Sequence, residues 1–136
     1  MIVIRMLILL YGITPLFARK AKSGEAQMTQ TIEIKPSTEL ATLINLFVVE
    51  PKNQDKLIEA LKEGIETFVS KQPGYVSAGL HKGMDGRHAL VYSQWRSPMD
   101  IEALLNNPEA SEYFKRIREI AQIEPIVYEV SYIHKG

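Results

Sequence analysis

The sequence predicts an α+β domain in which strands and helices follow one another in the order βαββαβ. Three observations support this prediction: a strand-like apolar segment at 40–49, an amphipathic helical pattern over 52–72, and a tight-turn signal at 83–86 between two further strand-like segments. The chain has 136 residues and no cysteine. One compact domain is therefore expected, stabilised by an apolar core and not by disulfides.

The N-terminal part of the chain is set apart from this domain: 1–37 is assigned to an extension and 38–136 to the domain. Residues 6–18 form an apolar run followed by basic side chains. The run is shorter than the ~20 residues of a membrane helix, so no stable span is predicted, but it matches the apolar part of a secretory signal. Two interpretations stay open. Cleavage after Ala26 predicts an exported protein, whereas a disordered extension or a true start at Met28 predicts a cytoplasmic one.

Charge is distributed unevenly along the chain. The whole sequence has 16 Lys+Arg and 16 Asp+Glu, but residues 1–27 carry four basic side chains and one acidic side chain. The remaining 109 residues therefore carry 12 basic and 15 acidic side chains. A mildly acidic domain without a clustered Lys/Arg face argues against nucleic acid as a partner.

The first strand is predicted over 40–49, because its residues alternate between two faces that are both mostly apolar. Pro51 ends this strand. A helix follows over 52–72, where apolar residues recur every three or four positions and charged residues fill the opposite face. The apolar positions of the helix are Leu57, Ile58, Leu61, Ile65, Phe68 and Val69.

A β-hairpin is predicted after the turn residues Pro73-Gly74, which end the helix. Its strands cover 75–82 and 88–96. The connection at 83–86 finishes on an Asp-Gly pair that is common in tight turns.

A second helical region begins at Ser97-Pro98, since serine caps a helix and proline fits its first turn. The helical pattern is interrupted at 106–108 and resumes over 111–121. The last strand is predicted over 126–133, a mostly apolar segment.

This order of elements is the split βαβ, or ferredoxin-like, plan, a four-stranded antiparallel sheet with both helices on one face. The helices can cover only one face, yet the first strand is apolar on both. An open apolar sheet face would be larger than a soluble monomer usually exposes. We therefore predict a homodimer whose two sheets pack face to face and close an α/β barrel across the two-fold axis.

Motifs for common cofactors and catalytic sites are absent from the sequence. It contains no G-x-G-x-x-G, P-loop, G-x-S-x-G or H-E-x-x-H pattern, and His81, His88 and His134 show no ligand spacing. No cofactor and no metal site are therefore predicted. The chain gives no support for a nucleotide-dependent enzyme, a serine hydrolase or a zinc protease.

Two residues are candidates for a functional site because their positions should be buried. Asn45 interrupts the apolar face of the first strand between Leu43 and Phe47, and a buried amide needs a partner. Trp95, the single tryptophan, lies near the end of the third strand. In a ferredoxin-like sheet the first and third strands are neighbours, so both side chains can line one pocket under the helices.

These residues resemble the antibiotic biosynthesis monooxygenase domain of the dimeric α/β-barrel superfamily. The resemblance covers about 38–134. It rests on the first strand with Asn45, the Gln-Pro-Gly-Tyr turn, the Gln-Trp-Arg-Ser end of the third strand, and the helix that leads through Asn-Asn-Pro to Tyr113. It implies a homodimer with one pocket per subunit, between sheet and helices.

The resemblance also implies a chemistry, because some members oxygenate anthrone-like or quinol-like substrates without metal or flavin. A related branch degrades haem with an asparagine on the first strand, a tryptophan on the third and a histidine on the following helix. Asn45 and Trp95 match the first two, but no histidine lies between His88 and His134. Haem binding is therefore the least favoured reading, since its axial ligand is missing.

The favoured hypothesis is a cofactor-independent monooxygenase that uses O₂ and a small aromatic substrate. Asn45 would hydrogen-bond the oxygen that gains charge, and Trp95 would supply an apolar wall and an indole N–H donor. Phe47, His81 and Tyr113 are further residues expected at the substrate. The base is open between His81, His88, Tyr113 and a water on Asn45. The alternative from another class is a non-catalytic barrel that binds a small molecule.

Overall fold

The computed structural model describes residues 30–35 and 40–136, so the predicted leader and the alternative start at Met28 lie outside the described residues. The chain divides into two units, with the boundary between Thr31 and Ile32. The second unit contains the sheet and helices described below. The domain boundary near residue 38 stays a prediction.

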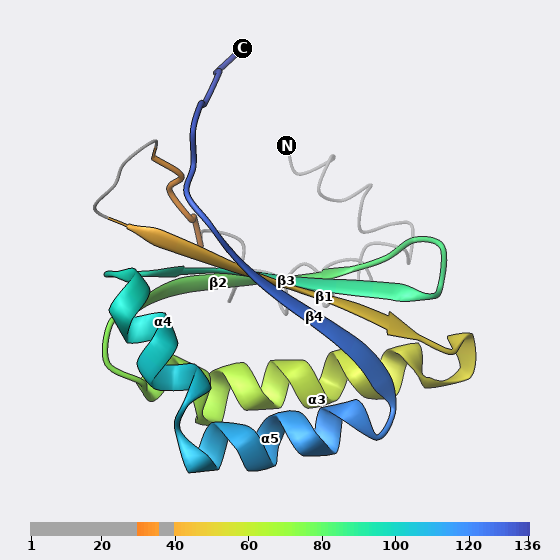
Figure 1. Ribbon diagram of the computed structural model, residues 1–136. Helices are drawn as coiled ribbons and strands as arrows, with labels where there is room; N and C mark the ends of the chain where they lie inside the picture. The colour runs from red at the N-terminus through yellow and green to blue at the C-terminus, as the bar shows by residue number, and fades with distance from the viewer. Residues whose placement is uncertain (1–29, 36–39) are drawn as a thin grey trace, which may run out of the picture. The chain divides into compact units, whose positions relative to one another are not determined.

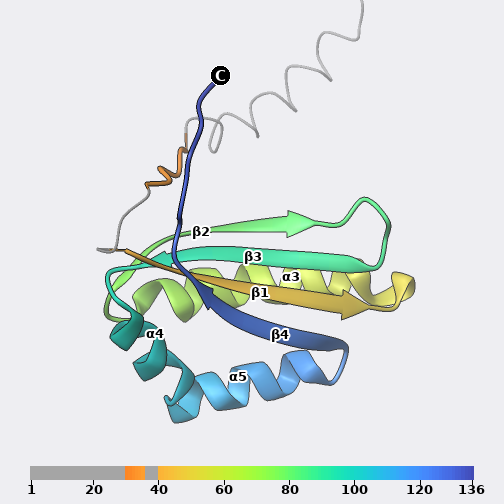
Figure 2. The same ribbon diagram turned by 45° about the horizontal axis from the view of Figure 1, so that its top comes forward.

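The second unit is a four-stranded antiparallel sheet with the spatial order β2-β3-β1-β4, covered on one face by helices (Figures 1 and 2). The strands are β1 (Ala41–Val49), β2 (Tyr75–Lys82), β3 (His88–Trp95) and β4 (Ala121–Tyr128). The helices are α3 (Gln54–Thr67), α4 (Pro98–Leu105) and α5 (Pro108–Arg118), with short 3-10 turns at Pro51–Asn53 (η1) and Val69–Lys71 (η2). The predicted ferredoxin-like α+β fold is confirmed.

The last strand is the main error of the sequence prediction. It was expected over 126–133, and the structure places β4 at Ala121–Tyr128, so α5 also ends earlier than predicted. The error arises at Pro125, because a proline normally marks a strand boundary and the predicted strand began after it. β4 lies at the edge of the sheet and pairs only with β1, and an edge strand tolerates a proline that lacks a ladder donor.

The two faces of β1 have different environments, and this confirms its predicted alternation. Leu43, Asn45 and Phe47 are buried against the helices. Leu46 and Val48 point to the other side, which we call the open face, and are 38% and 43% exposed. The C-terminal segment after β4 leaves the sheet on the open-face side (Figure 1).

The turn between η2 and β2 depends on a glycine. Gly74 has φ +85°, in the left-handed region that favours glycine, and a Cβ there would overlap the side chain of Asp100. Asp100 lies in the first turn of α4, where its backbone N–H donates to Ser97 Oγ at 3.3 Å. The carbonyl of Gly74 accepts from the N–H of Arg96 at 2.7 Å. These contacts hold the end of β3 against the start of α4, next to Trp95.

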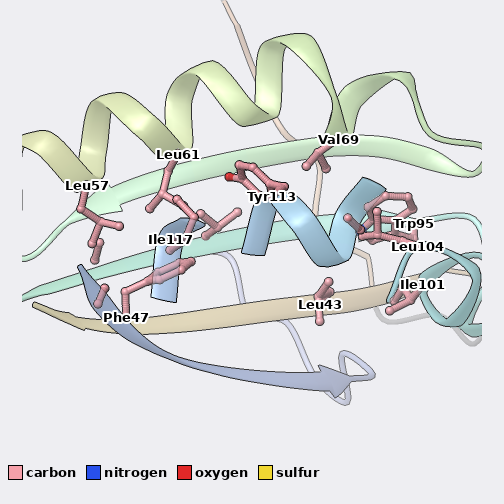
Figure 3. Packing of buried hydrophobic residues seen from close by; sticks show 14 of the residues in the cluster. Leu43, Phe47, Leu57, Leu61, Val69, Trp95, Ile101, Leu104, Tyr113 and Ile117 are labelled. Atoms are coloured by element: carbon pink, nitrogen blue, oxygen red, sulfur yellow. The ribbon is translucent and has the colours of Figure 1, made fainter. Parts of the chain in front are cut away.

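The core fills the space between the sheet and the helices (Figure 3). Its largest fully buried side chains are Trp95, Phe47, Leu43, Leu57, Leu61 and Ile101. Among the described residues, none of the helices is long and apolar enough to cross a membrane.

Candidate active site

Asn45 and Trp95 line the same small cavity between the sheet and the helices, as the sequence predicted. This inner cavity has a volume of about 20 Å³, which is room for about one water molecule. Most of its lining is apolar. The lining includes Leu43, Phe47, Leu61, Val91, Tyr113 and Phe114.

Asn45 is the polar centre of the inner cavity. It lies in the middle of β1, opposite Val91 of β3 and Pro125 of β4. The residue is buried, and its Oδ1 has no hydrogen-bond partner among the described residues. Leaving such an acceptor unpaired costs about 1–3 kcal/mol, so its partner is expected to be a water or a bound molecule.

Trp95 forms a wall of the inner cavity and is fully buried. Its indole N–H donates to Ser93 Oγ at 2.9 Å, and that hydroxyl in turn donates to the carbonyl of Leu43 at 3.2 Å. The edge-to-face contact with Tyr75, at 5.6 Å between ring centroids, fixes the indole further. In this structure Ser93 accepts the indole N–H, so the role of that N–H as a donor to substrate stays a prediction.

Ser93 is a site residue that the sequence analysis missed. It alternates with Val91 and Trp95 on the face of β3 that packs against the helices, and it is buried. A signal for it existed: a polar residue at a core position of a strand is the same observation that singled out Asn45.

Phe47 and Tyr113, both predicted to bind substrate, line the inner cavity, and their role there stays a prediction. Burial raises the pKa of Tyr113 to about 12, against a smaller opposing effect of Arg116. The phenol is therefore protonated at neutral pH. It can donate a hydrogen bond there, but it is poorly suited to act as the general base.

His81 and His88 do not reach the inner cavity. His81 pairs with Leu90 in β3, which itself pairs with Leu46 on the open face, so the sheet separates the His81 side chain from Asn45. His88 contacts Asp85 beside the hairpin turn. The described residues contain no group of three or more His, Cys, Asp or Glu side chains that could hold a metal ion.

Tyr113 reaches the inner cavity only because of a glycine in α3. A Cβ on Gly64 would overlap the outer edge of the Tyr113 ring and its hydroxyl. Glycine inside a helix lowers its stability by about 1 kcal/mol relative to alanine. At this position the glycine allows α5 to approach α3 closely. A glycine within an otherwise regular helical pattern was the signal for this contact.

Gly64→Ala is expected to lower the free energy of unfolding by about 1–3 kcal/mol, because the added methyl group overlaps the Tyr113 ring. In a Tyr113→Leu background the ring edge is absent, so Gly64→Ala should be neutral or stabilising by up to about 1 kcal/mol. Urea unfolding of the four proteins measures this coupling. Additive effects of the two substitutions would contradict the close contact.

The buried phenol also predicts a loss of stability at alkaline pH. Unfolded Tyr113 ionises near its ordinary pKa of 10.0, whereas in the folded protein the pKa is about 12. Between these two values the unfolded chain releases its proton first, so the free energy of unfolding falls as the pH rises; below them the contribution is constant. Urea unfolding from pH ~9 to ~11.5 should show a smaller fall for Tyr113→Phe than for the parent. Equal falls would contradict the burial of this hydroxyl.

Solved structures share this fold at low sequence identity. SnoaB from Streptomyces nogalater, described as a cofactor-independent oxygenase, matches with a TM-score of 0.58 and 17% identity, over 72% of this chain and 96% of that chain. A conserved protein from Bacteroides thetaiotaomicron matches with a TM-score of 0.60 and 19% identity, over 68% of this chain and 99% of that chain. At such identities the similarity shows the fold.

Two comparisons of the sequence identify the family of this chain. Tetracenomycin-F1 monooxygenase from Streptomyces glaucescens is 36% identical over 99 residues, which cover 73% of this chain and 88% of that protein. The family model for antibiotic biosynthesis monooxygenase matches residues 41–116, from the start of β1 into α5. The chain belongs to the antibiotic biosynthesis monooxygenase family.

Proposed function

We propose that this protein is a cofactor-independent monooxygenase that oxidises a small aromatic substrate, quinol-like or anthrone-like, at the inner cavity. The observation that carries the proposal is the buried Oδ1 of Asn45, which has no partner among the described residues and lies in a mostly apolar cavity. A polar atom in that position is costly for folding and useful for binding. The 36% identity to a relative named as a monooxygenase supports the same reaction class.

The reaction can proceed with electrons from the substrate alone. Loss of a proton from an electron-rich anthrone or quinol gives an anion that transfers an electron to O₂. The two radicals then combine at carbon. For an anthrone, the O–O bond of the resulting hydroperoxide breaks as the second C–H proton is lost, so one oxygen atom stays as a carbonyl and the other leaves as water. The CH₂ group supplies both hydrogens of that water, and its carbon loses the four electrons that O₂ gains. The protein must hold the substrate, accept the first proton and stabilise the anion.

Asn45 is suited to these tasks because a carboxamide carries both an acceptor and two donors. Its Oδ1 can accept from a substrate hydroxyl or from a water that takes the first proton, and its N–H groups can donate to the oxygen that gains charge. Of the four candidate bases, the water on Asn45 is the one the geometry favours. The two histidines lie away from the cavity, and Tyr113 is protonated.

Asn45→Ala is expected to lower kcat/KM by about 100-fold or more, because the transition-state anion loses its hydrogen bonds. Trp95→Phe keeps an apolar wall and should lower it by about 10-fold or less. Oxygen consumption with a panel of quinols and anthrones measures both effects. Asn106→Ala, an exposed asparagine after α4, is the matched control and should retain the parent rate. Parent activity in Asn45→Ala would contradict the proposed role.

The second candidate function is a non-catalytic barrel that binds a small hydrophobic molecule. The hollow of about 680 Å³ between α3 and α5 favours it, since a ligand could bind there without reaching Asn45. The same oxygen assay separates the two functions. A parent protein that binds the aromatic panel but consumes no O₂ with any member is a binding protein.

We also propose that the protein is a homodimer in which the open faces of two sheets pack together. The open face carries large apolar side chains that are about 40% or more exposed on β1 and β4. Exposed apolar side chains gathered on one sheet face are typical of an interface, although Gln122 and Glu124 lie between them. These side chains are Leu46, Val48, Ile126 and Tyr128.

Leu46→Lys is expected to yield monomer or aggregate, because it places a charge at the centre of this interface. Met99→Lys on α4 changes a side chain that is 77% exposed on the helical side, and it should leave the dimer intact. Sedimentation velocity of the two variants and the parent measures the oligomeric state. A dimeric Leu46→Lys protein would show that the open faces do not form the interface.

A further inference from the structure

The inner cavity is closed to an aromatic substrate in this conformation, yet a much larger groove lies next to it. This outer groove is a hollow of about 680 Å³ between α3 and α5. Its volume is within the range of known ligand pockets, whereas the inner cavity holds about one water. A substrate that reacts at Asn45 therefore needs a path that joins the two spaces.

Tyr113 is the residue that separates them. Among the described residues, it is the only one that lines both the outer groove and the inner cavity. Its ring projects from α5 towards α3 and lies over Gly64, where no Cβ blocks it (Figure 3). Neighbouring rings hold it by packing: Phe114 at 5.0 Å and Phe68 at 6.1 Å between centroids. A change in the Tyr113 side-chain torsions would open the wall between groove and cavity.

The chemistry of the outer groove also suits a polar aromatic compound. Apolar side chains of Phe68, Ile117 and Ile120 line the groove together with charged groups of both signs: Lys56, Arg116, Glu63, Glu109, Glu112 and Glu119. A phenol or an anthrone has a flat apolar body with one or two oxygen atoms at its edge. The body of such a molecule can contact the apolar side chains, while a hydroxyl donates to a glutamate or a carbonyl accepts from Lys56 or Arg116.

We propose that the aromatic substrate reaches Asn45 through the outer groove, and that the Tyr113 ring closes this route and limits the size of the rings that pass. This inference rests on the proposed function for the identity of the substrate. Gly64 is then the positioning residue that gives the Tyr113 ring its closed position. The inner cavity grows only while the ring is displaced, so between turnovers it has room for about one water.

The single tryptophan allows a test that is independent of catalysis, since Trp95 lines the inner cavity. Collisional quenching of its fluorescence by acrylamide should be weak in the parent and about threefold or more stronger in Tyr113→Ala, with Tyr113→Leu as the variant of smaller structural cost. Leu104→Ala removes part of the lining of the inner cavity at a residue that does not line the outer groove, and should change quenching much less. Equal quenching in Leu104→Ala and Tyr113→Ala would overturn the proposal.

The route itself is tested by filling the groove. Ala60 lies one helical turn before Gly64 in the outer groove, and Ala60→Phe should slow both association and dissociation of 1-naphthol about 10-fold, leaving Kd unchanged. Stopped-flow quenching of Trp95 measures both rates. Glu66→Phe adds the same ring to an exposed position of α3 outside the groove and should behave as the parent. Parent rates in Ala60→Phe would overturn the route.

Failure of the route and failure of the proposed function give different results. A parent that consumes O₂ with an anthrone while Ala60→Phe keeps the parent kcat/KM refutes the route and leaves the monooxygenase function standing. A parent that consumes no O₂, but in which Ala60→Phe slows 1-naphthol exchange, refutes the function and supports the route.

Discussion

The alternation of β1 is the constraint on which the rest of the structure depends. Because successive side chains of a strand point to opposite faces, this central strand packs against the helices on one side and supplies the open apolar face on the other. A slip of one residue in its register would exchange the two sets. The core, the position of Asn45 and the proposed dimer surface all follow from this one register.

The inner cavity combines groups whose hydrogen bonds are satisfied with one that is not. The indole of Trp95 is held by Ser93, and Ser93 is held by the carbonyl of Leu43, so this wall is rigid. Asn45 Oδ1 alone is left without a partner among the buried side chains that the structure describes. A fixed apolar wall beside a free carboxamide is an arrangement that binds and orients a flat polar aromatic molecule, at some cost in folding stability.

The helical layer adds the element that can move. Tyr113 packs against Gly64 and two aromatic rings, so the fit between these side chains sets the position of its ring. Burial keeps it protonated, which removes it from the candidate bases and leaves it the role of a wall. The volumes on its two sides, about 20 Å³ and 680 Å³, make this ring the boundary between a closed site and an open surface.

The sequence by itself determined the order of the elements, the two faces of β1 and the shared position of Asn45 and Trp95, because these depend on local periodicity and on the neighbours that a βαββαβ sheet imposes. It misplaced β4, since Pro125 is a breaker except at a sheet edge, and edge position is a property of the whole sheet. Only the tertiary structure decided that Ser93 occupies the indole N–H, that His81 lies across the sheet, and that Tyr113 divides two cavities over Gly64. These are relations between side chains of different elements, and they exist only once the elements are packed.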